Sequence, residues 1–148
     1  MAEKHARIEF RYAGFWLRLV SSIVDGGILL IWVWILSLVF GVSITSPSHT
    51  GDDFTIFRLF ELTAIFTAWI YFAVMESSFI QATIGKLFMG IYVTDMDGDR
   101  LAFNRATIRY WLKYVTIFTF LVGFIMSAFT KKKQTVHDMI VKSLVLKR

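Results

Sequence analysis

Two residues of opposite charge, Arg18 and Asp25, lie inside a stretch (residues 15–40) that is otherwise almost entirely apolar. A stretch of this length is more than enough to cross a bilayer as a helix. An ionised aspartate near the middle of such a helix costs on the order of 2.5–3.5 kcal/mol on insertion scales. The spacing places both charges on one helix face about two turns apart, too far for direct contact. Each charge therefore needs a partner from another part of the chain.

Three ionisable residues elsewhere in the chain are candidate partners: Glu76, His137 and Asp138. Glu76 lies near the inner end of a second apolar stretch, residues 59–80, which must run antiparallel to the first. Glu76 is therefore expected at about the same depth in the membrane as Arg18 and Asp25. His137 and Asp138 follow a third apolar stretch and lie on the same side as Arg18 if the C-terminus is cytoplasmic.

These five residues could serve two kinds of chemistry. In a structural clamp, Arg18 bridges the carboxylates and fastens the C-terminal segment to the first helix, since bidentate arginine–carboxylate pairs are strong where water is scarce. In an ion or proton site, desolvation raises the pKa of a buried carboxylate while a nearby arginine lowers it, so protonation can couple to a bound cation. His137 is a candidate gate, or it orients a neighbour. The sequence leaves both roles open.

Small residues accompany the buried aspartate. Ser22 and Gly26 are four positions apart and lie beside Asp25. Small residues at this spacing let a second helix approach closely. We therefore expect this side of the first helix to pack against protein, with Asp25 pointing into the contact.

Other motifs do not support a metal, a cofactor or catalysis. The acidic run at residues 95–99 resembles the start of a calcium loop, but the spacing is wrong and no glutamate follows where one is needed. Gly85-Lys86 lacks the upstream glycine of a phosphate loop. The chain has no cysteine, and no nucleophile motif accompanies its serines and histidines. We expect no metal site, no cofactor and no enzymatic activity.

The composition is that of a membrane protein. Hydrophobic residues make up 56% of the 148 residues, and the mean hydropathy is +0.60, which is unusual for a soluble domain. The net charge of +5 could suggest nucleic acid. However, the basic residues fall in blocks that flank apolar stretches, as membrane topology requires. We expect a single domain over residues 1–148 in the inner membrane, with no nucleic-acid partner.

The predicted fold is an all-α transmembrane bundle with two full spans, residues 15–40 and 59–80. A third apolar stretch, residues 111–130, either crosses the membrane or re-enters it at a bend near Gly123. With both termini cytoplasmic, every basic residue except Arg58 lies inside, which favours re-entry.

A small cytoplasmic β-hairpin completes the predicted fold. Residues 91–94 and 100–103 read as its strands, and Asp97-Gly98 as its turn. The apolar, β-branched segment at residues 140–146 could add a strand to it. A charged amphipathic segment at residues 1–14 is expected to lie along the membrane surface, unless it is a frayed tail.

Three groups of residues form a pattern that extends over about residues 12–145. They are Ala13-Gly14-Phe15-Trp16-x-Arg18-x6-Asp25, Thr83-x-Gly85-Lys86-x3-Gly90-x2-Val93 and Thr135-x-His137-Asp138. Together they resemble the pattern of the RDD family. This resemblance implies a small membrane protein of a family named for one arginine and two aspartates, here Arg18, Asp25 and Asp138. Some members are linked to cation/proton antiport, and others look like assembly partners of larger membrane complexes.

The sequence favours two functions over an enzyme. The first is a homo-oligomeric transporter, such as a cation/proton exchanger, because one small bundle can hardly enclose a pathway. The second is a non-transporting scaffold or assembly factor in which the charged residues are structural. Under either function, the expected partners of the protein are the bilayer, anionic lipids at the basic cytoplasmic face, a second copy and another membrane protein.

Overall fold

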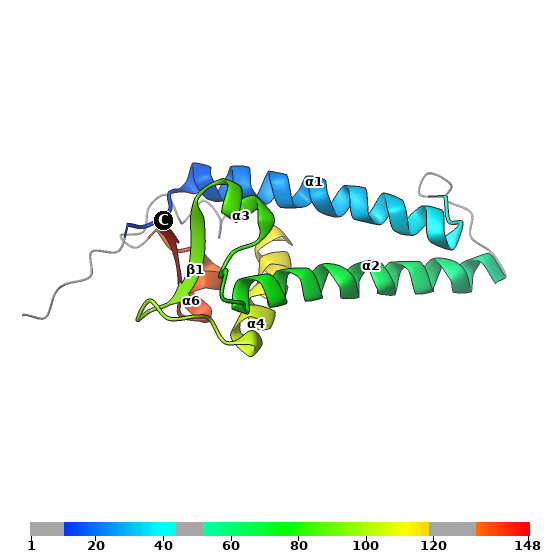
Figure 1. The fold of residues 1–148 in the computed structure, drawn as a ribbon. Coiled ribbons are helices and arrows are strands. Elements are labelled where there is room, and N and C mark those ends of the chain that lie inside the picture. The colour runs from blue at the N-terminus through cyan, green and yellow to red at the C-terminus, as the bar shows by residue number, and fades with distance from the viewer. Residues whose placement is uncertain (1–10, 44–51, 119–132) are drawn as a thin grey trace, which may run out of the picture.

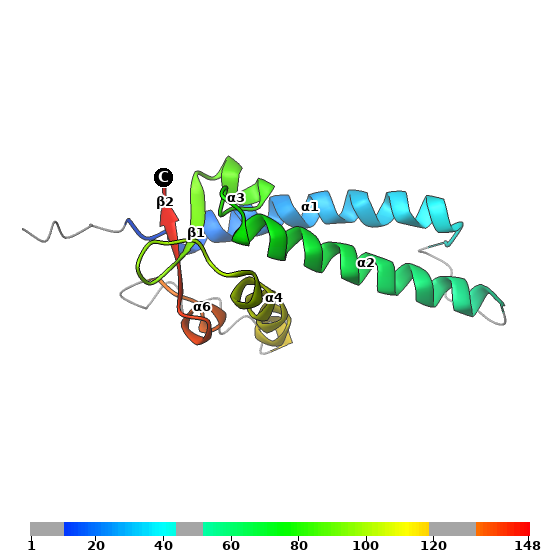
Figure 2. The ribbon, with the colours of Figure 1, turned by 60° about the horizontal axis from the view of Figure 1, so that its bottom comes forward.

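A computed structural model describes residues 11–43, 52–118 and 133–148. Two long helices lie side by side, and shorter elements gather at one end of the pair (Figures 1 and 2). We call these shorter elements the platform. The long helices are α1 (Phe15–Phe40) and α2 (Asp52–Ser77), and the platform contains α3 (Ile84–Phe88), β1 (Ile91–Asp95), α4 (Phe103–Phe118), α6 (Val136–Ile140) and β2 (Ser143–Lys147).

Both long helices have the length and composition of membrane spans. Mean hydropathy is 2.3 for Phe15–Phe40 and 1.4 for Phe54–Ser77. The first helix has its predicted bounds, whereas α2 begins at Asp52 instead of residue 59. The earlier start follows from the sequence, because neither glycine nor proline interrupts residues 52–77 and most of these residues tolerate a helix.

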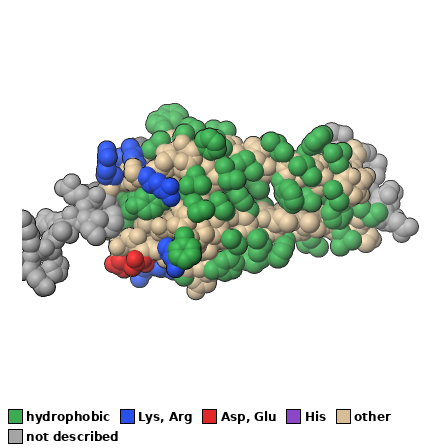
Figure 3. Space-filling view, viewed as in Figure 1, with side chains coloured by type: hydrophobic (Ala, Val, Ile, Leu, Met, Phe, Trp, Pro, Cys, Tyr) green, Lys and Arg blue, Asp and Glu red, His purple; other side chains and the backbone are tan. Residues whose placement is uncertain are grey.

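The surface of the long helices is apolar. Only 17% of the apolar window in α1 and 11% of that in α2 is buried inside the protein. Large side chains such as Leu30, Val39 and Leu62 are exposed. Figure 3 shows hydrophobic side chains along both long helices and basic ones gathered at the platform end. An apolar surface of this extent is costly in water and normal against lipid.

The platform is built on a two-stranded antiparallel sheet. Ile91 lies opposite Lys147, and Asp95 lies opposite Ser143. The segment before α1 joins the same sheet, since the amide of Ala13 donates to the carbonyl of Val145 at 2.8 Å. The start and the end of the described chain are therefore fastened together. The core beneath the sheet consists of Ala13, Ile91, Val93, Leu101, Ala106 and Val145.

The predicted β-hairpin is wrong in its second strand. The turn forms, with Gly98 at φ 94° and the Asp95 carboxylate accepting the amides of Asp97 and Asp99 at 2.9 and 3.0 Å. However, β1 pairs with β2, and residues 100–102 form no strand. The C-terminal segment is the better partner because Leu144, Val145 and Leu146 all become buried, which stabilises the sheet more than Arg100-Leu101-Ala102 could.

Two predictions fall partly outside the described residues. Helix α4 begins at Phe103, before the predicted apolar stretch, and is described as far as Phe118. Whether residues 111–130 cross or re-enter depends on residues 119–130, which lie outside the described residues. The predicted amphipathic segment lies mostly outside them as well.

The predicted close packing at Ser22 and Gly26 also needs correction. Ser22 is exposed, and a Cβ at Gly26 would meet nothing within 4 Å. The close approach beside Asp25 is made by Gly85 of α3, where a Cβ would lie 2.2 Å from the carbonyl oxygen of Ser21 and 2.9 Å from Cγ of Asp25. The small residue thus belongs to the short helix that packs on α1, and is not part of α1.

Substitution of Gly85 therefore tests the packing of α3 on α1. We expect Gly85→Ala to destabilise the protein by about 1–3 kcal/mol because the added methyl group forces backbone apart. The matched control is Gly26→Ala, which we expect to be neutral or stabilising by up to about 1 kcal/mol, since it replaces an open glycine inside a helix. Thermal unfolding in detergent measures both variants. Equal stability of the two would contradict the observed packing.

Candidate functional site

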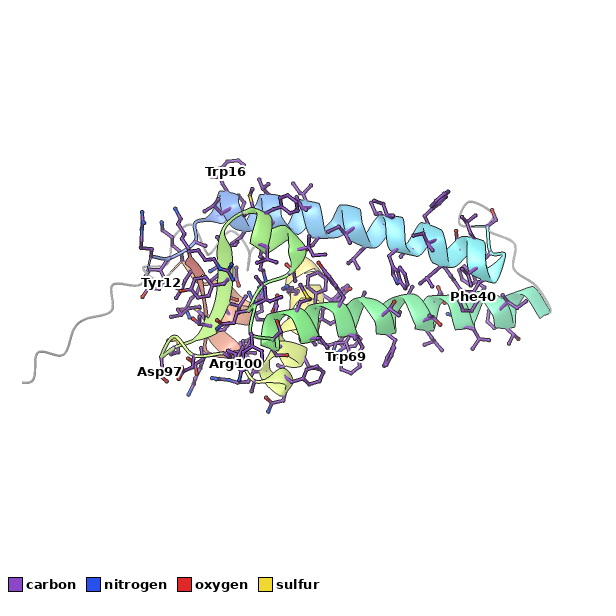
Figure 4. All side chains as sticks on the ribbon, viewed as in Figure 1. Tyr12, Trp16, Phe40, Trp69, Asp97 and Arg100 are labelled. Atoms are coloured by element: carbon purple, nitrogen blue, oxygen red, sulfur yellow. The ribbon has the colours of Figure 1, made fainter. Side chains whose placement is uncertain are left out.

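Six charged side chains meet inside the platform end of the protein. We call them the charge cluster: Arg18, Glu76, Lys86, Arg109, Lys113 and Asp138. They come from five different helices, α1, α2, α3, α4 and α6. Figure 4 shows how densely side chains fill the space between these elements. All except Lys113 are buried, so each ion pair excludes most water.

Asp138 binds two arginines and also begins its own helix. Its carboxylate accepts a hydrogen bond from Nη1 of Arg18 and another from Nε of Arg109 at 2.8 Å. It also forms a capping box with Thr135, in which each side chain bonds the other's backbone amide. Burial alone would raise the pKa of Asp138, but the guanidinium groups of Arg109 and Arg18 hold that pKa well below its usual range. The carboxylate is therefore ionised at neutral pH.

Glu76 binds three cations. Its carboxylate accepts hydrogen bonds from Nη1 of Arg109 at 2.5 Å, from Nζ of Lys113 at 3.3 Å and from Nζ of Lys86. Arg109 and Lys113 are four positions apart on α4 and therefore face Glu76 together. Because Arg109 also binds Asp138, its guanidinium joins α2 to α6 through α4.

Lys86 lies in an environment with excess positive charge. Burial lowers its pKa most, and Arg109 and Lys113 lower it further. The attraction of Glu76 offsets only part of this, so the pKa of Lys86 falls to about 7 in spite of the ion pair. Near neutral pH, this lysine can therefore exist with or without its proton.

Asp25 has neutral hydrogen-bond partners among the described residues. Its carboxylate accepts the hydroxyl of Tyr71 at 3.0 Å, the hydroxyl of Thr83 at 2.5 Å and the backbone amide of Gly85 at 2.9 Å. Arg18 instead donates to Asp138 and to the carbonyl of Ala13. The structure therefore gives the two charges of α1 separate partners, and Arg18 does not bridge the two aspartates.

His137 lies beside the charge cluster, with Nε2 3.8 Å from Oδ1 of Asp138. Burial lowers the pKa of His137 to about 3, and the neighbouring Asp138 only partly offsets this. The imidazole is therefore neutral at physiological pH. A neutral, buried side chain fits an orienting role better than a gate that titrates near pH 7.

Of the five residues predicted from the sequence, Arg18, Glu76 and Asp138 belong to the charge cluster and His137 touches it. Sequence reasoning missed the roles of Arg109, Lys86 and Lys113. Arg109 and Lys113 were visible as basic residues on one face of a helix, but that pattern equally fits a helix at the membrane surface. Only the position of Glu76 distinguishes the two cases.

Comparison with known proteins identifies the family of this chain. The sequence profile of the RDD family matches residues 12–142. The chain belongs to the RDD family. It is 31% identical over 146 residues to the uncharacterized protein YxaI of Bacillus subtilis strain 168, covering 90% of this chain and 96% of YxaI. It is 30% identical to the uncharacterized membrane protein YteJ of the same strain, covering 91% of this chain and 80% of YteJ. No solved structure matches the chain.

Family membership and the two apolar helices together make this RDD protein a membrane protein. The sequence resemblance implies that Arg18, Asp25 and Asp138 are the three residues of the family name. In this RDD protein, Arg18 and Asp138 form an ion pair across 120 positions of sequence. Asp25 instead accepts a hydrogen bond from the amide of Gly85 on α3. The two aspartates therefore attach different parts of the platform to α1.

The charge cluster predicts a strong dependence of stability on Arg109. We expect Arg109→Gln to destabilise the protein by about 3–5 kcal/mol because two buried carboxylates lose a partner. The control is Arg58→Gln, which removes an exposed pair with Glu61 at 2.8 Å and is expected to cost at most about 1 kcal/mol. Chemical or thermal unfolding in detergent compares them. Similar losses in both would show that the charge cluster is not structural.

His137 predicts a pH dependence of stability. Because the folded-state pKa is about 3 and the ordinary value is 6.5, the unfolded chain binds a proton in this interval and the folded chain does not. Stability should therefore fall as pH falls from 6.5 to about 5, a range in which ordinary aspartates and glutamates stay mostly ionised. His137→Gln should flatten this slope in unfolding measured against pH. An unchanged slope would contradict the buried, neutral imidazole.

Proposed function

We propose that this RDD protein is a non-transporting membrane scaffold. Its two long helices anchor it in the bilayer, and the charge cluster fixes the platform rigidly to their inner ends. The supporting observation is that Asp25, Glu76 and Asp138 are each bound by groups of the same chain. Groups that are fully engaged in holding elements together suit a structural role.

The balance of charge also disfavours a cation pathway through the charge cluster. Within the described part of the chain, four cations surround only two carboxylates, Glu76 and Asp138. A cation that entered would meet repulsion from all four, and it would have to displace Arg109 or Lys86 from a carboxylate. Such displacement of a buried partner is costly.

We propose that the platform and both termini lie in the cytoplasm, because basic residues gather at the platform end and positive charge is retained inside. In this orientation the basic face meets anionic lipids of the inner membrane. The exposed apolar faces of α1 and α2 are then available to a second copy or to another membrane protein. We propose no enzymatic activity. Labelling of an Arg148→Cys variant from outside cells would contradict this orientation.

Homo-oligomeric cation/proton exchange is the second candidate, and one observation favours it. Asp25 is a buried carboxylate in a membrane-spanning helix, and among the described residues its hydrogen bonds come from the neutral donors of Tyr71, Thr83 and Gly85. A carboxylate without a bound cation can exchange a proton or a metal ion more readily than one paired with arginine.

Flux through vesicles distinguishes the two candidates. For the scaffold, we expect purified wild-type protein in proteoliposomes to give no sodium-driven proton flux above that of protein-free vesicles. We also expect Asp25→Asn to lose about 1–3 kcal/mol of stability because the donors of Thr83 and Gly85 lose charged acceptors. Glu61→Gln, which replaces a carboxylate of α2 whose side chain is 37% exposed, is the matched control. Flux that disappears in Asp25→Asn while stability is unchanged would establish transport and overturn the scaffold.

A further inference from the structure

A small pocket, partly open to the outside, lies against the charge cluster. All four of its cations, Arg18, Lys86, Arg109 and Lys113, line this pocket. The hydroxyl-bearing residues Ser21 and Ser22 and the neutral His137 complete most of the wall. Glu76 and Asp138 are absent from the lining, so the cations present their positive charge to the pocket while the carboxylates lie behind them.

Arg18, which lines this pocket, has a hydrogen-bond donor without an acceptor among the described residues. Arg18 is 4% exposed, and its Nε and Nη1 donate to Ala13 and Asp138. Its Nη2 is buried and has no hydrogen-bond partner in the described part of the chain. A guanidinium carries five N–H donors and a buried one left unpaired is unfavourable, so an acceptor at this position would be stabilising.

The charge around the pocket is also unbalanced. Four cations face two carboxylates in the described part of the chain, and Asp25 is engaged by other groups. Burial is the main cause of the lowered pKa of Lys86, about 7, and the neighbouring Arg109 and Lys113 lower this pKa further. An anion in the pocket would relieve the repulsion between Lys86, Arg109 and Lys113.

We infer that this pocket binds a phosphate group, carried either by free phosphate or by the headgroup of an anionic lipid. A phosphate offers several acceptor oxygens to the donors of Arg18, Lys86 and Lys113 at once, and arginine matches its geometry well. Its charge at neutral pH, about −1 in a lipid diester and up to −2 in a monoester, is close to the excess of two cations. The small pocket suits one such group. This site does not depend on whether the protein transports ions.

Stabilisation by defined anions tests the site in the full-length protein. In detergent, sodium phosphate is compared with sodium chloride at equal ionic strength by thermal unfolding. In nanodiscs, phosphatidylglycerol is compared with phosphatidylcholine. Stabilisation by inorganic phosphate identifies free phosphate as a ligand, and stabilisation by phosphatidylglycerol alone identifies a lipid headgroup. No preference in either comparison would overturn the proposal.

A pair of lysine variants separates the pocket from general attraction to the basic face. Lys113→Gln removes a cation whose 3.3 Å contact with Glu76 is the longest ion pair of that carboxylate and whose side chain is 26% exposed, so the fold should persist. It should weaken the apparent affinity for the stabilising anion about tenfold, as loss of a charged hydrogen bond does. Lys147→Gln, on the exposed end of β2, should leave the affinity unchanged. Equal weakening in both variants would overturn the pocket.

Native mass spectrometry of the wild type supplies a readout that needs no variant. After incubation with phosphate or phosphatidylglycerol, the expected result is one retained phosphate or lipid molecule per chain. Retention of neither would overturn the site even if both lysine variants unfold.

Discussion

The guanidinium group of Arg109 lies between Glu76 on α2 and Asp138 on α6 and donates a hydrogen bond to each. All three side chains are buried, so water cannot take the place of a hydrogen-bond partner unless the structure opens locally. A buried charge left without its partner costs far more than an exposed one. The positions of α2, α4 and α6 therefore depend on one another through this single residue, and the other ion pairs of the charge cluster extend the same dependence to α1 and α3.

Contacts at the platform also join segments that are far apart in the sequence. Arg18, near the start of α1, binds Asp138, and Ala13 hydrogen-bonds Val145 in the sheet. The first membrane helix is therefore fastened to the last elements of the polypeptide. Hydrophobic burial could hold the long helices only weakly to each other in lipid, because the bilayer is as apolar as their side chains. Ion pairs and backbone hydrogen bonds at the platform supply the specificity that apolar contact lacks.

The two aspartates of the RDD pattern represent two ways to bury an acid. Asp138 is neutralised by arginines, whereas Asp25 is solvated by two hydroxyls and an amide. The first arrangement holds a carboxylate permanently charged. The second requires close approach of α3, which Gly85 permits because it has no side chain. In the proposed scaffold both serve to hold elements together, and the excess of cations beside them is the basis of the proposed anion site.

Much of the local structure could be predicted from the sequence. The apolar run at residues 15–40 predicts α1 within its observed bounds, the strand at residues 91–94 and the turn at Gly98 form where expected, and the RDD pattern is recognisable. These features depend on hydropathy, on backbone preference and on residue spacing, all of which act over a few neighbours.

Only the tertiary structure decided which distant groups meet. The strand expected to pair with residues 100–103 pairs with β2, the close contact expected at Gly26 is made by Gly85, and Arg109, which the sequence does not single out, binds two carboxylates. In each case the local pattern fits both outcomes equally well. The choice depends on the free energy of burying particular apolar and charged groups together, and that quantity exists only when the whole chain has come together.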